Sequence, residues 1–336
     1  MTTKNSWRAP SNIALIKYWG KKTQGNQLPL NPSLSFTLKN CYTESTAELL
    51  DLNKTESEVM AYLDGARVKS FDAKALKLKR YFEKDFPGLI DKAIVLQTKN
   101  TFPHSSGIAS SASGMAALSL CLLNFFKTET DADFFHLASY YARLGSGSAG
   151  RSLFPHLAAW GLSELKGTTD EKAIAFNDYH EIFKDYQDSI LIVSKDEKSV
   201  SSTAGHKLME NHPYADARVQ NANKNFHELL SVLKNGDLEQ FNKIVESEAL
   251  ELHSLMMTST PSFILLAPET LAIVMAVRQF RKESKIPLCF TIDAGPNVHL
   301  LYPKKYLSAV HEFINAQKKN YLSVIHDEVG MGPQKI

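Results

Sequence analysis

The sequence contains little cysteine, and its three cysteines lie far apart, at Cys41, Cys121 and Cys289. An odd number of widely spaced cysteines fits neither a disulfide framework nor the paired spacing of a zinc site. This pattern is typical of a reducing compartment, and we expect a cytoplasmic location. Residues 1–10 also lack the apolar segment of a signal peptide, so no secretory leader is expected.

Neither sign of charge is in excess, because 38 Lys and Arg residues are balanced by 36 Asp and Glu residues. The net charge of +2 gives no support to a nucleic-acid partner or to binding at a membrane surface. The most apolar run, residues 115–126, is too short to span a bilayer and contains Ser119 and Asn124. We interpret this run as a core helix and expect no membrane partner.

Several common catalytic and nucleotide-binding patterns are missing. The chain has no G-x-x-x-x-G-K-[ST] phosphate loop, no G-x-S-x-G nucleophile elbow and no internal repeat. Residues 145–150 match G-x-G-x-x-G, but they follow a predicted helix and not a strand, so we reject a dinucleotide-binding (Rossmann) fold. His253, His299 and His326 have no partners at metal-ligand spacing, and we interpret each as structural.

The apolar periodicity predicts strands and helices that do not alternate regularly. The expected strands cover residues 13–16, 46–51, 58–63, 66–71, 93–100, 189–193, 288–293 and 298–302. The expected helices cover residues 73–86, 113–126, 133–143, 214–233, 238–257 and 268–280. Hairpins are expected at the Asp64-Gly65 turn and across residues 294–297. These antiparallel signals predict an α+β fold and not a doubly wound sheet.

Residues 103–114 form the most informative segment, with five serines and two glycines between a predicted strand and an apolar helix. The first N–H groups of a helix have no partner within the helix, and the helix dipole favours negative charge there. Serine hydroxyls add hydrogen bonds or bind Mg²⁺. The segment therefore predicts an anion site, and the alternative is an ordinary helix with a serine cap.

A second loop of small residues, 145–150, ends in Arg151. This loop can bind a carboxylate or a phosphate. The donors would be its backbone N–H groups, the hydroxyls of Ser146 and Ser148, and the guanidinium of Arg151. The alternative is a turn between helices with an arginine on the surface. A third hydroxyl-rich turn, residues 198–205, follows the strand at 189–193. The alternative is a helix cap, a role that does not exclude phosphate contact.

Two charged residues directly follow or end predicted strands. Lys17 follows the buried strand at 13–16, so we expect it to point into a site more readily than Lys22, which is expected to be solvated. Asp293 ends the strand at 288–293, before a Gly-Pro turn. It is either a turn former or a catalytic carboxylate.

Taken together, these segments resemble the diphosphomevalonate decarboxylases, within the GHMP superfamily of small-molecule kinases. The matching motifs occur in family order at residues 9–21, 30–35, 102–114, 143–152, 200–203, 256–259, 293–297 and 330–333. The resemblance implies a two-lobed GHMP-kinase-like fold with a ribosomal-protein-like N-terminal lobe (1–188), a ferredoxin-like C-terminal lobe (189–336) and a deep cleft between them. It also suggests a homodimer.

The resemblance implies that ATP, with Mg²⁺, phosphorylates the 3-hydroxyl of mevalonate 5-diphosphate. Loss of phosphate and CO₂ would then give isopentenyl diphosphate and ADP, in isoprenoid biosynthesis. Asp293 would be the catalytic aspartate, Lys17 its partner and Thr203 the third member of the group, while Arg151 would grip the substrate carboxylate. The further substrate-binding residues would be Asn12, Tyr18, Lys21, Ser146, Gly147 and Ser148. The ATP-binding residues would be Pro103, Ser105, Ser106, Gly107, Ala109, Ser110, Ser111, Ser113, Lys198, Ser201 and Ser202. Either Ser110 or Ser111 could be the Mg²⁺ ligand, and we choose Ser111 as the candidate.

Two departures from the family pattern leave the substrate open. Residues 104–106 read His-Ser-Ser where Thr-Ala-Ala is common, and Gly150 stands where a Cys is often found. The alternatives are decarboxylation of mevalonate 5-phosphate, or phosphorylation without loss of CO₂. The presence of Lys17, Asp293 and Thr203 favours a decarboxylase over a simple kinase. The presence of Lys17, Arg151 and Asp293 argues against a non-catalytic relative.

Overall fold

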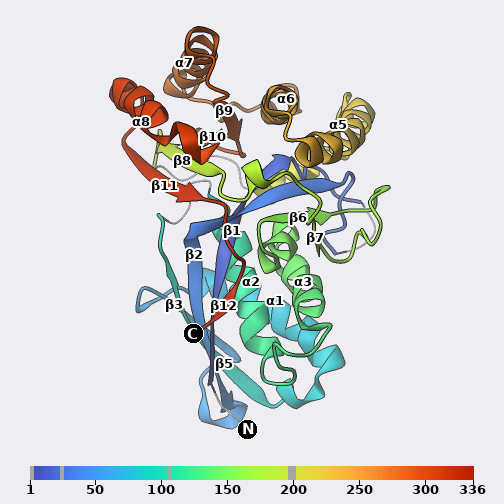
Figure 1. Ribbon diagram of the computed structural model, residues 1–336. Helices are drawn as coiled ribbons and strands as arrows, with labels where there is room; N and C mark the ends of the chain where they lie inside the picture. The colour runs from blue at the N-terminus through green and yellow to red at the C-terminus, as the bar shows by residue number, and fades with distance from the viewer. Residues whose placement is uncertain (1–3, 23–25, 104–107, 196–201) are drawn as a thin grey trace.

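The computed structural model describes residues 4–22, 26–103, 108–195 and 202–336, and it describes the backbone alone at Ser202 and Thr203. Two β-sheets form the framework, one of eight strands and one of four. Figure 1 shows the larger sheet with helices α1–α3 beside it, and helices α5–α8 gathered over the smaller sheet. The predicted α+β class is confirmed.

The larger sheet follows the order β12-β1-β2-β5-β3-β4, while β6 pairs with both β2 and β7. Strand β3 is parallel to β5, and the other pairings are antiparallel. Its strands are β1 (Lys4–Ile16), β2 (Ser33–Asp51), β3 (Val59–Leu63), β4 (Ala66–Arg67), β5 (Lys92–Asn100), β6 (Leu157–Trp160), β7 (Ile174–Ala175) and β12 (Gln334–Lys335). The C-terminal strand β12 thus returns to the sheet that contains the N-terminal strand.

Three helices cover one face of this sheet: α1 (Lys69–Asp85), α2 (Ser110–Leu123) and α3 (Phe134–Gly145). Helix α2 is buried on nearly all sides, which confirms the core helix expected from its apolar run. The strand expected at 66–71 is wrong beyond Arg67. There the Asp72 carboxylate accepts hydrogen bonds from the Arg67 guanidinium and the Ala61 N–H, at 2.6 and 2.9 Å, and so ties the first turn of α1 to the hairpin.

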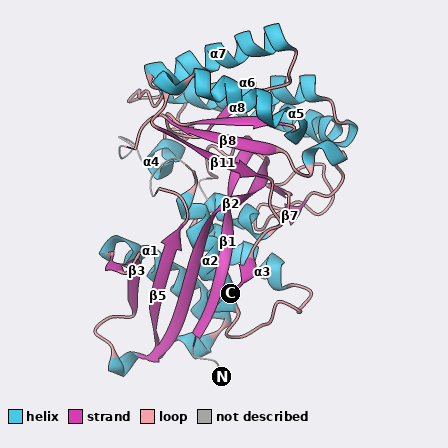
Figure 2. Ribbon diagram, turned by 60° about the vertical axis from the view of Figure 1, so that its left-hand side comes forward, coloured by secondary structure: helices cyan, strands magenta, loops and turns pink. Residues whose placement is uncertain are grey.

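The smaller sheet is antiparallel throughout, in the order β11-β8-β10-β9. Its strands are β8 (Gln187–Ile192), β9 (Cys289–Ile292), β10 (Val298–Tyr302) and β11 (Ser323–Glu328). The hairpin predicted across residues 294–297 is confirmed. Helices α5 (Ala215–Asn235), α6 (Leu238–Met257), α7 (Pro268–Ser284) and α8 (Leu307–Ala316) lie over this sheet, and the short α4 (Ser202–Lys207) lies below it, as Figure 2 shows.

Short 3-10 helices complete the described part of the chain. They are η1 (Leu52–Lys54), η2 (Pro87–Leu89), η3 (Gly147–Leu153), η4 (Glu181–Phe183), η5 (Lys304–Tyr306) and η6 (Lys318–Asn320). Within the described ranges, no helix combines the length and the apolar character needed to cross a membrane. The three cysteines are buried and free.

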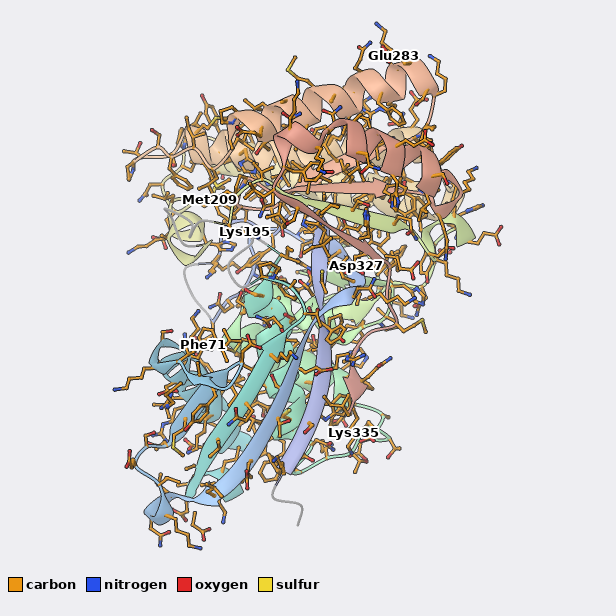
Figure 3. All side chains as sticks on the ribbon, turned by 90° about the vertical axis from the view of Figure 1, so that its left-hand side faces the viewer. Phe71, Lys195, Met209, Glu283, Asp327 and Lys335 are labelled. Atoms are coloured by element: carbon orange, nitrogen blue, oxygen red, sulfur yellow. The ribbon has the colours of Figure 1, made fainter. Side chains whose placement is uncertain are left out.

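The two sheets meet through a shared apolar core and a carboxylate. Phe36 of β2 packs against Tyr186 and Phe241 from the second half of the chain. The Asp327 carboxylate accepts hydrogen bonds from the backbone N–H groups of residues 39, 40 and 41, at 3.0, 2.7 and 2.7 Å. Figure 3 shows Asp327 and Lys195 at this junction. The ends of β1 and β9 also lie at this junction. Residues that follow these two strands therefore meet there, although they are far apart in the sequence.

Candidate functional site

A lysine and an aspartate from the two sheets form an ion pair at the junction. Lys17 follows the end of β1 and Asp293 follows the end of β9, and Lys17 Nζ lies 2.7 Å from Asp293 Oδ1. The lysine side chain is 2% exposed and the aspartate side chain 25% exposed, so the ion pair is enclosed at the lysine and partly exposed at the aspartate. The Asp293 carbonyl also accepts the Gly295 N–H at 2.7 Å. Asp293 therefore forms the turn through its backbone, while its side chain pairs with Lys17 and remains a candidate for the catalytic carboxylate.

Arg151 lies in η3 and is almost completely buried. Its guanidinium donates to the hydroxyls of Ser33 and Ser35, the latter at 3.0 Å, and to Asn12 Oδ1 at 3.3 Å. Burial lowers the pKa of Arg151 to about 10, although the nearby negative charge of Asp293 acts in the opposite direction. A buried cation held by neutral hydrogen-bond acceptors is suited to an anionic ligand.

Asn12 links the loop of Arg151 to strand β1. It lies beside an irregularity in the pairing of β1 with β2. Its Nδ2 donates to Ser152 Oγ at 2.8 Å and to the Ser148 carbonyl at 3.3 Å. The loop of residues 146–152 is therefore fixed to the strand that ends at Lys17, and the arginine and the lysine share one support.

The ring of Tyr18 lies close to Gly147 of this loop. A Cβ atom at Gly147 would lie 2.7 Å from Tyr18 Cε1 and 2.8 Å from the Tyr18 hydroxyl oxygen. That hydroxyl is buried and has no hydrogen-bond partner among the described residues. Burial raises the pKa of Tyr18, against the opposing effect of Arg151 and Arg143. The phenol therefore stays neutral and is available to donate a hydrogen bond to a ligand.

Helix α2 begins without a side-chain cap. Its N-cap is Ala109, in the left-handed region at φ 47°, so the expected alternative of a serine-capped helix is not what forms. A non-glycine residue in this region is strained, and such strain clusters at functional sites. Ser111 is exposed, with its Oγ 3.3 Å from Ser146 Oγ, so the two small-residue loops meet. Ser113, by contrast, is buried with its Oγ 2.6 Å from Thr43 Oγ1 and supports the helix.

The histidines expected to be structural each contact a neighbouring group. His299 Nδ1 lies 2.7 Å from Asp188 Oδ2, and His326 Nδ1 lies 2.9 Å from Ser189 Oγ. His253 Nε2 donates to the Asp293 carbonyl at 3.1 Å, which brings this residue next to the site. Across the described ranges, no group of three or more His, Cys, Asp or Glu residues is arranged to hold a metal ion.

Comparison with known proteins identifies the family. Residues 9–175 match the family model of the diphosphomevalonate decarboxylase-like N-terminal domain, and residues 189–328 match that of the mevalonate 5-diphosphate decarboxylase C-terminal domain. A diphosphomevalonate decarboxylase of Ganoderma lucidum is 32% identical over 327 residues, which cover 91% of this chain and 80% of that protein. The chain belongs to the diphosphomevalonate decarboxylase family.

Solved structures of this family share the fold of the chain. The mevalonate diphosphate decarboxylase of Staphylococcus aureus has a TM-score of 0.87 at 28% identity, over 100% of this chain and 98% of that one. A complex of MDDEF with MVAPP, AMPPCP and magnesium has a TM-score of 0.86 at 30% identity, over 99% of both chains. The expected two-lobed fold of the family is thereby confirmed.

Some of the residues that the family resemblance singles out lie outside the described ranges. These are Ser105, Ser106, Gly107, Lys198 and Ser201, and the side chains of Ser202 and Thr203 are not described either. Helix α4, which begins at Ser202, packs against the segment after Lys17. A Cβ atom at Gly205 would lie 2.5 Å from Trp19, and the Gly20 N–H donates to His206 Nδ1 at 3.0 Å.

Gly150, which departs from the decarboxylase family pattern, lies at a close contact. A Cβ atom there would be 3.0 Å from Ser139 Oγ and 3.2 Å from the Ser139 carbonyl oxygen. Ser139 Oγ also donates to the Gly150 carbonyl at 2.9 Å. The close approach of α3 to η3 therefore accounts for the small residue before Arg151.

Sequence reasoning missed two charged residues behind the lysine of the ion pair. Glu248 of α6 accepts the Lys17 N–H, and Arg218 of α5 donates to the Lys17 carbonyl, both at 2.9 Å. A signal for them was present. Glu248 falls among the apolar positions Val245 and Leu252 of its helix, where a charge is expected only if it is paired.

Proposed function

We propose that this chain catalyses the ATP-dependent decarboxylation of mevalonate 5-diphosphate to isopentenyl diphosphate, with release of ADP, phosphate and CO₂. The observation that carries this proposal for the described residues is the Lys17–Asp293 ion pair, whose aspartate side chain is 25% exposed. The buried Arg151, near enough to Asp293 for the two charges to interact, provides the second half of the site. Membership in the diphosphomevalonate decarboxylase family supports the same reaction.

In the first step, Asp293 orients the 3-hydroxyl of the substrate and accepts its proton. The hydroxyl oxygen then forms a bond to the γ-phosphorus of ATP, and ADP leaves. Lys17 holds the carboxylate in place at 2.7 Å and offsets negative charge that gathers around the transferred phosphoryl group. Thr203 completes this group, as the family resemblance implies.

In the second step, the bond between C3 and the phosphorylated oxygen breaks and phosphate leaves with the bonding electrons. The bond from C2 to the carboxylate carbon breaks, and its electron pair forms the alkene as CO₂ departs. Phosphorylation makes a tertiary hydroxyl a good leaving group, and the alkene takes up the electrons, so the protein contributes positioning and electrostatics.

Arg151 holds the substrate carboxylate in this account, because its buried guanidinium is held by neutral groups. The diphosphate lies at Tyr18, Lys21, Ser146, Gly147 and Ser148, with Asn12 supporting the loop. The hydroxyl of Tyr18, which has no hydrogen-bond partner among the described residues, supplies one hydrogen bond. Burial, and next the neighbouring charge of Lys77, lower the pKa of Lys21, as expected for a cation placed to receive an anion.

ATP is the co-substrate and Mg²⁺ the accompanying ion, as in the MDDEF complex with MVAPP, AMPPCP and magnesium. The uncapped start of α2, at Ala109 and Ser110, supplies N–H groups for the ATP phosphates. Pro103 has no N–H, and its contact with ATP is what the family resemblance implies. The exposed hydroxyl of Ser111 fits a Mg²⁺ ligand beside phosphate oxygens. When bound, Mg²⁺ neutralises charge on the ATP phosphates.

Three further properties are inferred from the family. We propose that residues 1–188 and 189–336 are the two lobes, that the protein is a homodimer, and that it works in the cytoplasm. Sedimentation equilibrium of the purified protein tests the dimer, since a mass near twice 37.5 kDa is expected.

The experiment that tests the function uses the purified protein with ATP, Mg²⁺ and either mevalonate 5-diphosphate or mevalonate 5-phosphate. ADP, phosphate and CO₂ are measured in parallel. Equal amounts of the three products from the diphosphate are expected, with the monophosphate a poor substrate. ADP without CO₂ would mean a kinase, and preference for the monophosphate would overturn the substrate assignment.

A further inference from the structure

The backbone of Lys17 is held by side chains from the other half of the chain. Lys17 directly follows the last residue of β1. Its N–H donates to Glu248 Oε2 at 2.9 Å. Its carbonyl accepts from the Arg218 guanidinium at 2.9 Å and from Asn31 Nδ2 at 3.0 Å. Buried backbone groups need such partners, and here two of the three, Glu248 and Arg218, are charged groups from the second half of the chain.

The two charged groups form a closed pair of their own. The Arg218 guanidinium donates to both oxygens of Glu248, at 2.8 and 2.7 Å, and the two side chains are 1% and 0% exposed. Two more side chains contact this pair. Asn225 Nδ2 donates to Glu248 at 2.8 Å, and Arg218 donates to the Glu251 carboxylate at 2.9 Å. Burial would raise the pKa of Glu248, but Arg218 outweighs it and holds the pKa below the ordinary value, so the carboxylate is ionised.

The same helix also reaches the partner of Lys17. His253 lies five residues after Glu248 on α6, and its Nε2 donates to the Asp293 carbonyl at 3.1 Å. One rigid helix thus contacts the backbone of both members of the ion pair, although these members come from different sheets. The separation of Lys17 Nζ and Asp293 Oδ1 therefore depends on where α6 lies.

We propose that Arg218 and Glu248 are positioning residues for catalysis, which fix the backbone of Lys17 so that its ammonium meets Asp293. This inference rests on the proposed function for the role of the ion pair. A buried ion pair adds little net stability compared with apolar side chains of similar size, so stability alone does not account for it. Its bonds to both backbone groups of Lys17 give it a directional role that an apolar pair would lack.

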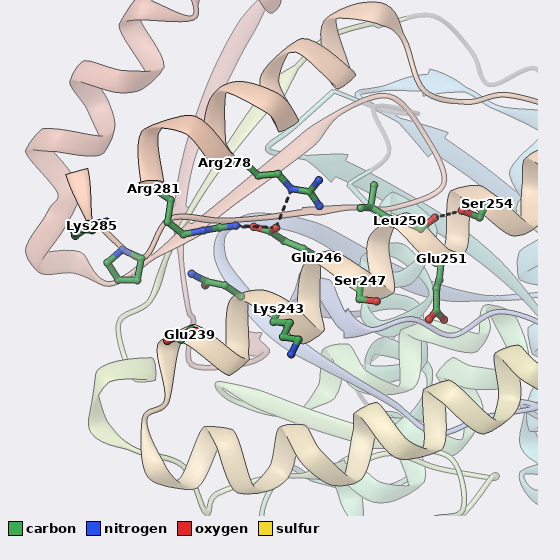
Figure 4. A pocket seen from close by; sticks show the side chains of 12 residues that line it. Glu239, Lys243, Glu246, Ser247, Leu250, Glu251, Ser254, Arg278, Arg281 and Lys285 are labelled. Atoms are coloured by element: carbon green, nitrogen blue, oxygen red, sulfur yellow. Dashed lines mark hydrogen bonds and ion pairs between the residues drawn. The ribbon is translucent and has the colours of Figure 1, made fainter. Parts of the chain in front are cut away.

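A matched control lies on another face of α6. Glu246 is 5% exposed and accepts two hydrogen bonds from Arg281, at 2.5 and 3.0 Å. Figure 4 shows Glu246 meeting Arg278 and Arg281 of α7, with Glu251 farther along the helix. Glu246 is therefore a buried, arginine-paired glutamate on the same helix, whose hydrogen bonds go to α7 and not to Lys17.

The test compares Glu248→Gln with Glu246→Gln in the full-length protein. Both variants keep the size of the side chain and remove one buried charge. We expect kcat to fall about tenfold to a hundredfold in Glu248→Gln, because a small misplacement of a catalytic group costs that much, with KM for mevalonate 5-diphosphate nearly unchanged. Glu246→Gln is expected to keep its kcat. Equal losses in the two variants, or none in Glu248→Gln, would overturn the proposal.

A double variant separates positioning from stability. Arg218→Met with Glu248→Met replaces the pair by apolar side chains, and the melting temperature should recover relative to Glu248→Gln. The value of kcat should stay low, because methionine removes the oxygen acceptor of the Lys17 N–H altogether. Recovery of kcat together with the melting temperature would show a purely structural pair and would overturn the proposal.

A readout without turnover keeps this test independent of the reaction itself. Hydrogen exchange at the Lys17 amide should become faster in Glu248→Gln and in the double variant, but not in Glu246→Gln. Unchanged exchange in Glu248→Gln would contradict the positioning role. A wild-type protein that released no CO₂ would count against the proposed function, and amide exchange would still decide whether Glu248 fixes Lys17.

Discussion

Lys17 Nζ and Asp293 Oδ1 lie 2.7 Å apart, although the two residues are 276 positions apart in the sequence. The lysine is almost wholly enclosed and the aspartate is not. A partly exposed carboxylate that is held by a buried ammonium can orient a hydroxyl group while the ammonium remains shielded from water. This relationship is the basis of the catalytic account.

Replacement of Lys17 by Met tests the ammonium. Methionine has a similar length and is apolar, so a site that is 2% exposed should accommodate it with little loss of stability. We expect kcat to fall by about a hundredfold or more, since the charge that holds Asp293 is gone. Lys22→Met is the matched control, because Lys22 is 42% exposed and pairs with Asp170 away from Asp293. A similar loss in both variants would count against the assignment.

Replacement of Arg151 by Ala should cost far more than replacement of Lys22 by Ala. The guanidinium of Arg151 is buried beside the proposed carboxylate site, and a desolvated, bidentate contact is stronger than a solvated one. We expect a loss of about 3 kcal/mol or more in kcat/KM for Arg151→Ala and almost none for Lys22→Ala. Comparable kcat/KM values in the two variants would remove Arg151 from the site.

Gly147→Ala should disturb substrate binding through Tyr18. The added Cβ would lie 2.7 Å from the Tyr18 ring, so the ring or the loop must move. We expect KM for the diphosphate substrate to rise about tenfold, with a smaller change in kcat. Gly88→Ala is the control, because its Cβ would meet Phe126 at an ordinary 3.4 Å and lies in another part of the fold. An unchanged KM in Gly147→Ala would contradict the role of Tyr18.

The affinity for the substrate should depend on pH through Lys21. Burial, followed by the neighbouring charge of Lys77, lowers the pKa of Lys21 from 10.5, so its proton is lost at a lower pH than in an ordinary lysine. The protonated form attracts the diphosphate, and KM should therefore rise as pH increases through this lowered pKa. Lys21→Arg keeps its charge and should flatten the rise. A steep rise in both proteins would assign the effect to another group.

Much of the site could be predicted because its residues lie at the ends of recognisable elements. Lys17 follows a buried apolar strand and Asp293 ends another, so the local pattern made each a candidate, and the family resemblance then implied their roles. Arg218 and Glu248 were missed, since a charge within an apolar stripe shows that a partner exists and does not show which one. Their helices, α5 and α6, contact the end of β1 only in the folded chain, so the sequence pattern does not show this contact.

The extent of the strands was also harder to predict than their existence. Strand β2 runs over Ser33–Asp51, whereas residues 46–51 alone were expected, because hydroxyl side chains interrupt the apolar pattern before them. Those hydroxyls are satisfied inside the protein, as the contact of Thr43 with Ser113 shows. Strand β11, with one buried residue, has too weak a pattern to be predicted and is held by its pairing with β8.

The central claim is that Asp293 carries the phosphoryl-transfer step, and a single-turnover experiment with Asp293→Asn tests it most directly. ADP and CO₂ are measured over time from mevalonate 5-diphosphate with ATP and Mg²⁺ at saturation. We predict that both rates fall together by about a thousandfold or more, because asparagine keeps the shape and cannot accept the proton. Full turnover by the variant would contradict the account.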